Sequence, residues 1–370
     1  MPFATRYAVA MATAHISLEA LTHNVNRIRS HLKASTKTLA AVKANAYGHG
    51  AVATARHLAA CGVDWFGVAT AGEALELRTG GLTAPVLIFS PVYEGIPELV
   101  NQNIPLTVAD EHSLEAIERS GVKEARVHLK VDTGMGRLGL SWRAAVDLAK
   151  RIDGGEATVL EGVWTHFAQS DNADETFTRQ QIEQFQAFLE RLEKNSVEPE
   201  LVHVANSAAI FAYPDVQFDM VRPGIALYGY HSSPHIAGLE PDLRPALTLS
   251  APITFVKRVK AGTPVSYDAL WRAPRDTTVA TVRIGYADGY PRLLTGKAEV
   301  LVQGEMRPVA GRICMDQLMV DVGELEPEIG ERVTLFGPGI LDAEAVAGRI
   351  GTISYELLVS LSPRVNRMYS

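Results

Sequence analysis

The segment Thr38–Gly50, TLAAVKANAYGHG, indicates the type of fold. Its first part, Thr38–Val42, is a short apolar run that is followed at once by Lys43. The segment before it, Leu18–Leu32, carries apolar residues at the spacing of one helix face. An amphipathic helix beside a short apolar strand is the repeating unit of α/β proteins.

This unit recurs along the first two thirds of the chain. Eight apolar runs alternate with segments of helical periodicity: Thr38–Val42, Trp65–Ala69, Pro85–Ser90, Pro105–Ala109, Arg126–Asp132, Leu160–Phe167, Leu201–Asn206 and Met220–Tyr228. Such strands are typical of a parallel sheet that is covered on both faces. Eight of them predict an α/β fold with a closed (β/α)₈ TIM-like barrel.

The pattern changes after residue 240, where strand-like segments follow one another without long helices. These segments are Leu247–Val259, Thr277–Gly285, Glu299–Val302, Arg307–Cys314, Leu318–Val322 and Arg332–Phe336, with one helix expected over Asp342–Ile350. We therefore predict an N-terminal extension over 1–13, the barrel over 14–240, and a mostly antiparallel β-rich domain over 241–370.

Composition excludes several classes of protein. The net charge is −7, and we find no basic run of the kind that binds nucleic acid. No apolar stretch approaches the roughly 18 residues of a membrane span. Cys61 and Cys314 form neither a disulfide framework nor a metal cage, so we expect a cytoplasmic protein without a metal. Residues 1–14 weakly resemble a signal peptide, but we favour a simple extension.

Lys43 is the first candidate for chemistry, because catalytic groups of such barrels lie at the carboxyl ends of strands. Its apolar neighbours place its amine at the barrel mouth. A buried lysine has a lowered pKa and becomes a nucleophile suited to Schiff-base chemistry. Most lysines are solvated surface residues, so position alone leaves both interpretations open.

A glycine-rich run follows the fifth strand. Gly134, Gly136 and Gly139 formally match the G-x-G-x-x-G dinucleotide fingerprint. However, this is the fifth βα unit rather than the first of a doubly wound sheet, and Arg137 would crowd a pyrophosphate. The motif alone is a weak indication of a dinucleotide site.

The last barrel strands end in further polar residues. Arg222 lies in an apolar run, and a buried guanidinium needs a partner. Ser207 and the Gly224–Ile225 amides follow strands seven and eight, where this fold commonly binds a phosphate. A nucleophilic lysine, a phosphate site and a buried polar network together point to pyridoxal phosphate.

These motifs carry a resemblance to a known family. Ala41–Gly50 resembles the lysine motif of the alanine racemases, the fold-type III PLP enzymes that interconvert L- and D-alanine. The resemblance runs from about residue 14 to the end of the chain, through Lys130–Gly139, Thr165–Phe167, His203–Ala208, Arg222–Gly229, Val265–Tyr267, Gly285–Arg292, Gly311–Asp316 and Ile353–Leu357. It explains the glycine-rich run without a dinucleotide.

The resemblance implies a two-base mechanism in a homodimer with shared active sites. Lys43 would hold pyridoxal 5'-phosphate and act as one proton-transfer base. Tyr267, contributed by the partner subunit, would act on the opposite face of the substrate. The chain departs from the family at Asp268, where the family usually has glycine, so a carboxylate lies beside the expected base.

The other roles are also implied by the resemblance. Arg222 would donate to the pyridine nitrogen and keep it unprotonated, and His166 would orient Arg222. Arg137 would contact the phenolic oxygen of PLP and the substrate carboxylate, and Lys130 matches a lysine that is carbamylated in many members. The remaining matches are the phosphate-binding Tyr47, Ser207, Gly224, Ile225 and Tyr355, and the substrate-side Met315 and Tyr286.

Alternatives were weighed against alanine racemisation. Decarboxylases of this architecture place an acidic residue against the pyridine nitrogen, whereas the run Val221–Ile225 has arginine in that role. A non-catalytic PLP carrier would lack the β domain and Tyr267. A broader racemase that also accepts serine stays open, although the bulky Tyr286 and Tyr355 favour a methyl side chain. Supply of D-alanine for peptidoglycan and alanine catabolism both remain open as roles.

Overall fold

The computed structural model describes residues 11–240, 242–339 and 341–370. This described chain divides into two compact units. The barrel unit consists of Leu21–Ala46 and Gly50–Leu243; the β unit consists of the residues up to Ala20, Tyr47–His49 and Arg244–Ser370. Most of the N-terminal extension expected over 1–13 lies outside the described residues, and the domain bounds stay a prediction.

The barrel unit is built on parallel strands that form a closed ring. Within the described residues these are β2 (Lys37–Ala41), β3 (Trp65–Val68), β4 (Val86–Ile88), β5 (Leu106–Val108), β6 (Ala125–Asp132), β8 (Thr158–Trp164), β9 (Leu201–His203) and β10 (Met220–Val221). Ladders join β10-β2-β3-β4 and β5-β6-β8-β9. Two further contacts join these ladders. The Ile88 amide at the end of β4 donates to Pro105 O, just before β5 (3.4 Å), and Asn206, which follows β9, forms a parallel β-bridge with Arg222, which follows β10, so the ring closes. The predicted barrel is confirmed.

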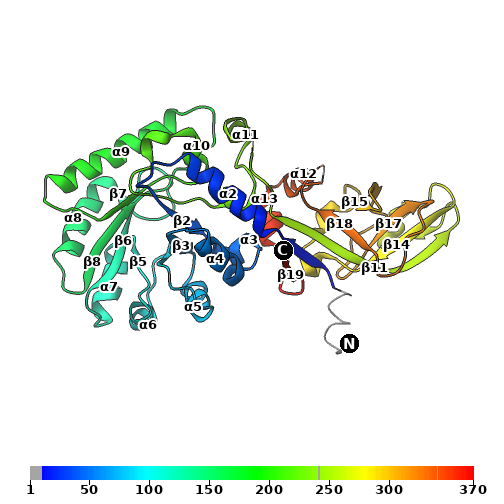
Figure 1. The fold of residues 1–370 in the computed structure, drawn as a ribbon, viewed down its shortest axis with the longest axis horizontal. Coiled ribbons are helices and arrows are strands. Elements are labelled where there is room, and N and C mark those ends of the chain that lie inside the picture. Colours follow the sequence, from blue (N-terminus) through cyan, green and yellow to red (C-terminus); the bar gives the residue numbers. More distant parts are fainter. Residues whose placement is uncertain (1–10, 241, 340) are drawn as a thin grey trace. The chain divides into compact units, whose positions relative to one another are not determined.

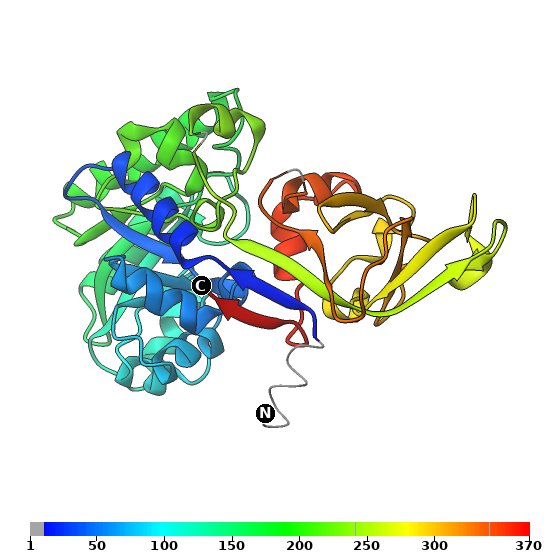
Figure 2. The same cartoon turned by 45° about the vertical axis from the view of Figure 1, so that its right-hand side comes forward.

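Helices surround these strands (Figure 1, Figure 2). They are α2 (Leu18–Ser30), α3 (Lys43–Tyr47), α4 (Ala51–Ala60), α5 (Ala71–Thr79), α6 (Ile96–Asn101), α7 (Glu111–Arg119), α8 (Trp142–Asp153), α9 (Thr176–Glu193), α10 (Ser207–Ala212) and α11 (Pro234–Leu239), with β7 (Leu140–Ser141) beside β6. On α9, the expected stripe of Ile182, Phe185 and Leu192 is buried. Leu39, Trp65, Leu87, Leu201 and Met220 pack together as a core cluster.

The β unit is mostly antiparallel, as predicted. Its strands are β11 (Leu247–Val259), β12 (Pro264–Val265), β13 (Trp271–Arg272), β14 (Thr277–Val282), β15 (Glu299–Val302), β16 (Glu305–Pro308), β17 (Leu318–Gly323) and β18 (Arg332–Phe336), with α12 (Ala343–Gly348) and α13 (Ser354–Val359). Two short strands complete its sheet: β1 (Thr13–Ile16) pairs antiparallel with β11 and parallel with β19 (Asn366–Tyr369). Residues 14–20, assigned above to the barrel, therefore lie in the β unit.

Two expected strands are shorter than the sequence pattern indicated. The run Met220–Tyr228 is a strand only to Val221 and continues as the 3₁₀ helix η2 (Ile225–Tyr228). The run Arg307–Cys314 contributes only its start, within β16. A proline lies at or just beyond the end of each strand portion: Pro223 is two residues past β10, and Pro308 is the last residue of β16. Proline has no amide hydrogen to continue a ladder, which explains the early end of β10.

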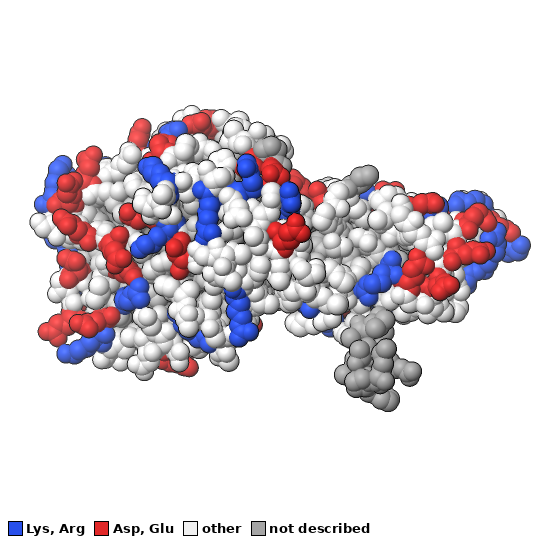
Figure 3. All heavy atoms as spheres, viewed as in Figure 1, with Lys and Arg blue, Asp and Glu red and all other residues white. Residues whose placement is uncertain are grey.

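Charge is distributed without segregation on the face drawn in Figure 3, where acidic and basic side chains are intermixed. Over the part of the chain that the structure describes, no helix is both long enough and apolar enough to cross a bilayer.

Candidate active site

Lys43 follows β2 in a backbone segment of unusual conformation. The residues Ala44, Asn45, Ala46 and Tyr47 have φ between 51° and 54°, which is one turn of left-handed helix. For L-residues this costs roughly 1–2 kcal/mol each. Such strain persists only where surrounding contacts hold it, and it is concentrated at functional sites.

Hydrogen bonds from neighbouring segments hold this turn. Glu73, in the first turn of α5, accepts from the Ala44 amide at 2.6 Å with one carboxylate oxygen. Its other oxygen accepts from the amides of Ala69 (2.8 Å) and Thr70 (3.2 Å) in a capping box. Asn45 accepts from the Ala51 amide at 2.7 Å. The lysine is therefore fixed by the helix that follows the next strand.

The surroundings of Lys43 favour its neutral form. Burial lowers the pKa of Lys43, and the positive charge of Arg137 lowers it further, while Glu73 acts in the opposite direction. Its Nζ lies 6.0 Å from the centroid of the Phe89 ring. The expected lowered pKa of a strand-end lysine is present here, which is the condition for a nucleophilic amine.

Arg222 is buried and is held from several sides. Its Nη1 donates to His203 Nδ1 (3.0 Å) and to His203 O (2.7 Å). Its Nη2 donates to Thr165 O (2.7 Å), to Val204 O (3.1 Å) and to His166 Nδ1 (3.3 Å). Burial lowers the pKa of Arg222 to about 9, so it remains charged at neutral pH. The expected contact between His166 and Arg222 is present.

Lys130 and Arg137 lie on β6 and on the loop that follows it. Lys130 is buried, donates to Val131 O at 2.6 Å, and has its pKa lowered to about 7, mainly by burial. Arg137 is exposed, and its charge lowers the pKa of Lys130, Lys43 and His166. The structure thus brings these expected residues within electrostatic reach of one another.

The glycines of this loop have a local structural role. Asp132 accepts from the amides of Gly134 (2.9 Å) and Gly136 (3.1 Å), both of which have positive φ. A Cβ on Gly139 would lie 2.5 Å from the carbonyl oxygen of Lys130. These contacts account for the G-x-G-x-x-G pattern without a pyrophosphate.

The expected phosphate residues of the barrel unit come together. Ser207 begins α10, and Gly224 and Ile225 lie at the start of η2. The Gly224 amide donates to Ser207 Oγ at 2.8 Å, and the Ala226 amide does so at 3.4 Å. This hydrogen-bonded corner joins the ends of strands seven and eight.

Tyr47 and Tyr355 meet within the β unit. Their ring centroids lie 6.0 Å apart, and burial raises the pKa of Tyr47 to about 12, so its hydroxyl remains a donor. A Cβ on Gly48 would lie 2.1 Å from Leu358 O, so only glycine fits at this close approach. Arg367 also donates to Gly48 O at 3.2 Å.

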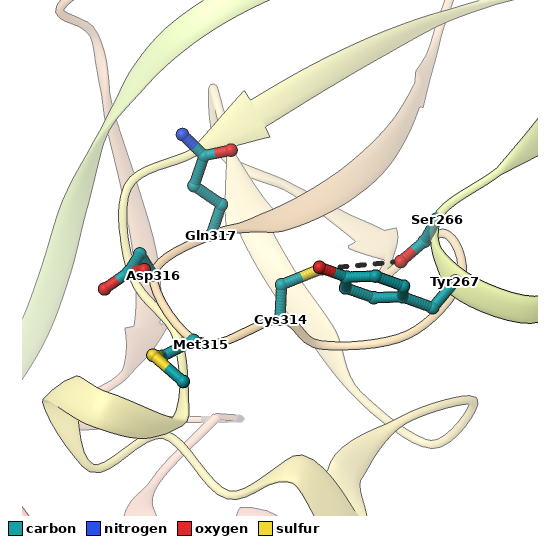
Figure 4. Close-up of a pocket in the computed structure, with 6 residues that line it drawn as sticks. All are labelled: Ser266, Tyr267, Cys314, Met315, Asp316 and Gln317. Atoms are coloured by element: carbon teal, nitrogen blue, oxygen red, sulfur yellow. Dashed lines mark hydrogen bonds between the residues drawn. The ribbon is translucent and has the colours of Figure 1, made fainter.

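Tyr267 lines a pocket of about 530 Å³ in the β unit, together with Met315 and neighbouring residues (Figure 4). Tyr267 begins the short helix η3 (Tyr267–Ala269) and is 68% exposed, and Met315 is 52% exposed. Ser266, drawn in the same close-up, donates from Oγ to Arg312 O at 2.8 Å and lies 3.5 Å from Cys314 Sγ. The two residues expected to act from the partner subunit thus share one surface.

Asp268 and Tyr286 adjoin this pocket. Arg312 Nε donates to Asp268 at 2.8 Å, and Asp268 has a positive φ of 61° in a position where the family usually has glycine. Tyr286, at the start of η4 (Tyr286–Asp288), is 41% exposed, and its amide donates to Cys314 O at 3.1 Å.

Sequence reasoning missed several residues that organise the site. Glu73 could have been found, because Thr70 and Glu73 form the Ser/Thr-x-x-Glu pattern of a capping box. His203 was visible as a histidine in an apolar strand, but its contact with Arg222 was not. Thr165 acts through its carbonyl oxygen, which leaves no signal in the sequence.

Comparisons with known proteins agree along nearly the whole chain. The profile described as "Alanine racemase, N-terminal domain" matches residues 16–232, and that described as "Alanine racemase, C-terminal domain" matches residues 246–369. The alanine racemase of Desulforamulus reducens is 42% identical over 96% of this chain and 98% of its own length. That of Treponema denticola is 42% identical over 96% and 97%.

Solved structures give the same result. The alanine racemase of a D-cycloserine-producing Streptomyces lavendulae superposes with a TM-score of 0.91 at 38% identity, over 98% of this chain and 97% of that one. The alanine racemase of Bacillus anthracis with bound L-Ala-P superposes with a TM-score of 0.92 at 36% identity, over 98% and 95%. The expected fold and enzyme class are confirmed, and the chain belongs to the alanine racemase family.

Proposed function

We propose that this enzyme racemises alanine with pyridoxal 5'-phosphate held by Lys43, and with Lys43 and Tyr267 as the two proton-transfer groups. The assignment depends above all on Arg222, a buried arginine whose two terminal nitrogens are occupied by backbone carbonyls and imidazoles. An arginine fixed in this way suits a neutral ring nitrogen, and it distinguishes a racemase from a decarboxylase.

The residues present fit the cofactor. The lowered pKa of Lys43 favours the neutral amine that a carbonyl carbon requires. Ser207, Gly224 and Ile225 form a hydrogen-bonded corner suited to a phosphate, and Tyr47 and Tyr355 would add hydroxyl groups to it. When bound, pyridoxal phosphate supplies an electron sink that stabilises negative charge on the substrate α-carbon.

Arg222 would direct a hydrogen bond to the ring nitrogen without transferring its proton. A guanidinium has donors only and remains charged at neutral pH. Its contacts with Thr165, Val204 and His203 restrict its rotation, and His166 accepts from the same Nη2. A ring nitrogen that stays unprotonated is a weaker electron sink, which suppresses side reactions such as transamination.

The α-proton would be moved at two named atoms. Lys43 Nζ would act on one face of the substrate and Tyr267 Oη on the other, because racemisation removes the proton from one face and returns it to the opposite one. Arg137 and Met315 would bind the substrate carboxylate. Tyr286 and Tyr355 would narrow the entrance and favour the methyl side chain of alanine.

Lys130 would be carbamylated and would orient Arg137. The pKa of Lys130, lowered to about 7, supports this role, since only the neutral amine reacts with carbon dioxide. The reaction forms one N–C bond and releases one proton. A carbamate replaces a buried cation by an anion, which suits the positive charges of Arg137 and Arg222 that now lower the pKa of Lys130.

The proposed assembly is a homodimer in which each β-rich domain completes the partner's site. Tyr267 and Met315 are more than half exposed in one copy, and Tyr286 is substantially exposed, as expected for side chains that a second copy covers. The organisation proposed with it is an extension over 1–13, a barrel over 14–240, whose first residues up to Ala20 pack with the β unit, and a β-rich domain over 241–370. The free thiols Cys61 and Cys314 suit the cytoplasm, where D-alanine would be made for peptidoglycan or alanine degraded.

A chiral assay with each alanine enantiomer tests the reaction, with serine, lysine and arginine as competitors. We expect both directions with alanine and weak competition by the larger amino acids. Borohydride reduction and peptide mapping test the cofactor assignment, and should find the pyridoxyl group on Lys43. Equal turnover of serine would favour the broader racemase, and a pyridoxyl group on Lys130 or Lys257 would contradict the site.

A further inference from the structure

A chain of buried polar side chains continues from Arg222 through the interior of the barrel unit. His203 Nε2 lies 2.8 Å from His128 Nδ1, and His128 Nε2 lies 3.2 Å from a carboxylate oxygen of Glu161. The other oxygen of Glu161 accepts from Arg126 Nε at 2.9 Å. His128 and His203 are fully buried, so their ring nitrogens depend on these partners rather than on water, whereas Glu161 is 5% exposed and lines a pocket together with Arg126.

The direction of every hydrogen bond in this chain follows from its first member. Arg222 has no acceptor, so His203 Nδ1 must accept from it and carry no proton. The neutral imidazole of His203 then carries its proton on Nε2 and donates to His128 Nδ1. His128 in turn carries its proton on Nε2 and donates to Glu161, which also accepts from Arg126.

The electrostatics agree with this direction. Burial lowers the pKa of His203 far below its usual value, and the charge of Arg222 lowers it further. Burial also lowers the pKa of His128, although Glu161 opposes this. For Glu161, burial would raise the pKa, but the hydrogen bonds from His128 and Arg126 outweigh it and lower the pKa overall. Two neutral imidazoles therefore link the cation of Arg222 to the anion of Glu161.

The surrounding residues leave room for these rings and fix them. A Cβ on Gly162 would lie 2.5 Å from His128 Nδ1, so the ring of His128 requires glycine at this point of β8. Trp164 stacks on His203 with centroids 5.8 Å apart and ring planes within 5°. The rings of Trp65 and His128 meet in an edge-to-face arrangement with centroids 5.4 Å apart. The imidazoles cannot rotate freely to change the nitrogen that each presents.

We propose that Glu161 and His128 are positioning residues for racemisation, which polarise the His203 ring that accepts from Arg222 and thereby fix the hydrogen-bonding geometry of Arg222. This relay of Arg222, His203, His128 and Glu161 rests on the proposed contact of Arg222 with the cofactor ring nitrogen. A chain of polarised hydrogen bonds in a low-dielectric interior transmits the effect of its terminal anion more strongly than it would in water.

The first test measures the protonation of His128 and His203 directly in the wild-type holoenzyme. With ¹⁵N-labelled histidine, NMR should find His128 and His203 neutral, protonated on Nε2 and unprotonated on Nδ1, and unchanged between about pH 6 and 9. Their N–H protons should exchange slowly, because both rings are buried. Either ring protonated on Nδ1, or charged within this range, overturns the relay.

The second test removes the terminal charge. Glu161→Gln keeps the shape of the side chain but removes the negative charge at the end of the chain, while Arg222 still sets the order of donors, so only the polarisation of the hydrogen bonds is lost. We expect kcat to fall about tenfold with KM changed less than about twofold, as when an outer partner of a site residue is lost. We also expect the ¹⁵N signals of both histidines and of the cofactor ring nitrogen to shift.

Glu240→Gln is the matched control. Glu240 is also buried in the barrel unit and accepts from an arginine and a histidine, Arg27 Nη2 at 2.8 Å and His31 Nε2 at 2.6 Å, but it has no described link to Arg222. It should lower thermal stability comparably while leaving kcat and the ring-nitrogen signal at wild-type values.

These outcomes separate the relay from the proposed function. Wild-type kcat and ring-nitrogen signal in Glu161→Gln would overturn the positioning role, as would equal losses of kcat in both variants. If Glu161→Gln does not fold, the wild-type histidine signals decide. A wild-type enzyme that racemises alanine and carries its cofactor on Lys43, but has the histidines in other forms, overturns the relay alone.

Discussion

The two halves of the candidate site are built in opposite ways. Arg222 is buried and is held by carbonyls and imidazoles from neighbouring strand ends of the barrel unit. Tyr267 is 68% exposed and lies in a turn of the β unit where Ser266, Asp268 and Ala269 all have positive φ. The barrel residues take their geometry from one chain, whereas in the proposed assembly a second copy would cover Tyr267.

The two proposed proton-transfer residues nevertheless share one feature, because each adjoins left-handed backbone that side-chain hydrogen bonds hold. Behind Lys43, the Ala44 amide donates to Glu73. Beside Tyr267, Ser266 and Asp268 both bond to Arg312. Backbone strain of this kind is maintained by its surroundings, so it fixes a reactive group in one orientation. The Ala44–Glu73 hydrogen bond and the Arg312–Asp268 hydrogen bond are both exposed in one copy of the chain.

The largest effect is expected for Lys43→Ala, which removes the reactive group of the barrel half. Activity should fall by about 10³-fold or more, because both the covalent attachment and one acid–base group are lost. The purified variant should also lose the absorbance of a lysine-bound cofactor. Lys150→Ala, which removes a partly exposed amine from α8, should keep wild-type activity. Substantial activity in Lys43→Ala would contradict the assignment.

Tyr267→Phe tests the exposed half and should lower racemisation by about 10²- to 10⁴-fold, the usual contribution of a positioned acid–base group. The ring keeps its volume, so cofactor binding should be retained. The variant should exchange the α-hydrogen of D-alanine with deuterated solvent faster than that of L-alanine, as only Lys43 remains. Tyr93→Phe, at another exposed tyrosine, is the control. Equal exchange of both enantiomers at near-native rates would exclude Tyr267.

Mixing the two inactive variants tests whether the halves come from different chains. In a Lys43→Ala and Tyr267→Phe heterodimer, one of the two sites would contain both intact groups. Random exchange of subunits should therefore restore about a quarter of wild-type activity. No recovery, with exchange demonstrated by a tagged subunit, would place both groups on one chain.

The sequence predicted the barrel well because hydrophobic periodicity is local. The strands beginning near Thr38, Trp65 and Leu201 were placed within a few residues of their observed bounds. The strands β1 and β19 were missed because they are four residues each and pair with segments distant in sequence. No propensity of alanine or asparagine predicts four consecutive left-handed residues after Lys43, since tertiary contacts impose them.

The candidate site was predictable only where a motif extends along the chain. Lys43, Arg137 and Ser207 could be named from strand ends and resemblance. The contacts of His128 with His203 and Glu161 depend on the registers of β6, β8 and β9, and on which side chains of those strands face the interior. A sequence read one residue at a time contains no signal of that pairing.

Lys130 is expected to show a smaller, pH-dependent effect within the barrel half. Its pKa is lowered from 10.5 to about 7, so its neutral fraction is small at pH 6 and predominant at pH 8. With ¹³C-bicarbonate, a carbamate signal should therefore grow as the pH rises through 7. Lys130→Met should abolish the signal and lower kcat/KM by about tenfold or less. A signal that is independent of pH, or that persists in the variant, would contradict this assignment.

The smallest effect is expected at Asp268, where this chain departs from its family. Asp268→Gly removes the ion pair with Arg312, which involves a largely exposed carboxylate and is worth about 0–1 kcal/mol. It also relieves a positive φ that costs an L-residue roughly 1 kcal/mol. The two changes oppose each other, so the free energy of unfolding should change by less than about 1 kcal/mol, measured by denaturant titration.

Asp268→Asn separates the loss of the ion pair from the relief of the backbone, because asparagine tolerates this backbone but loses the charge. If the ion pair matters more than the backbone, both variants will be less stable than the wild type. If the backbone matters more, only Asp268→Gly will gain stability, and that is the outcome we expect because the pair is exposed to solvent. A loss of more than about 2 kcal/mol in Asp268→Gly would mean that the Arg312 contact holds the Tyr267 turn as firmly as burial holds Arg222.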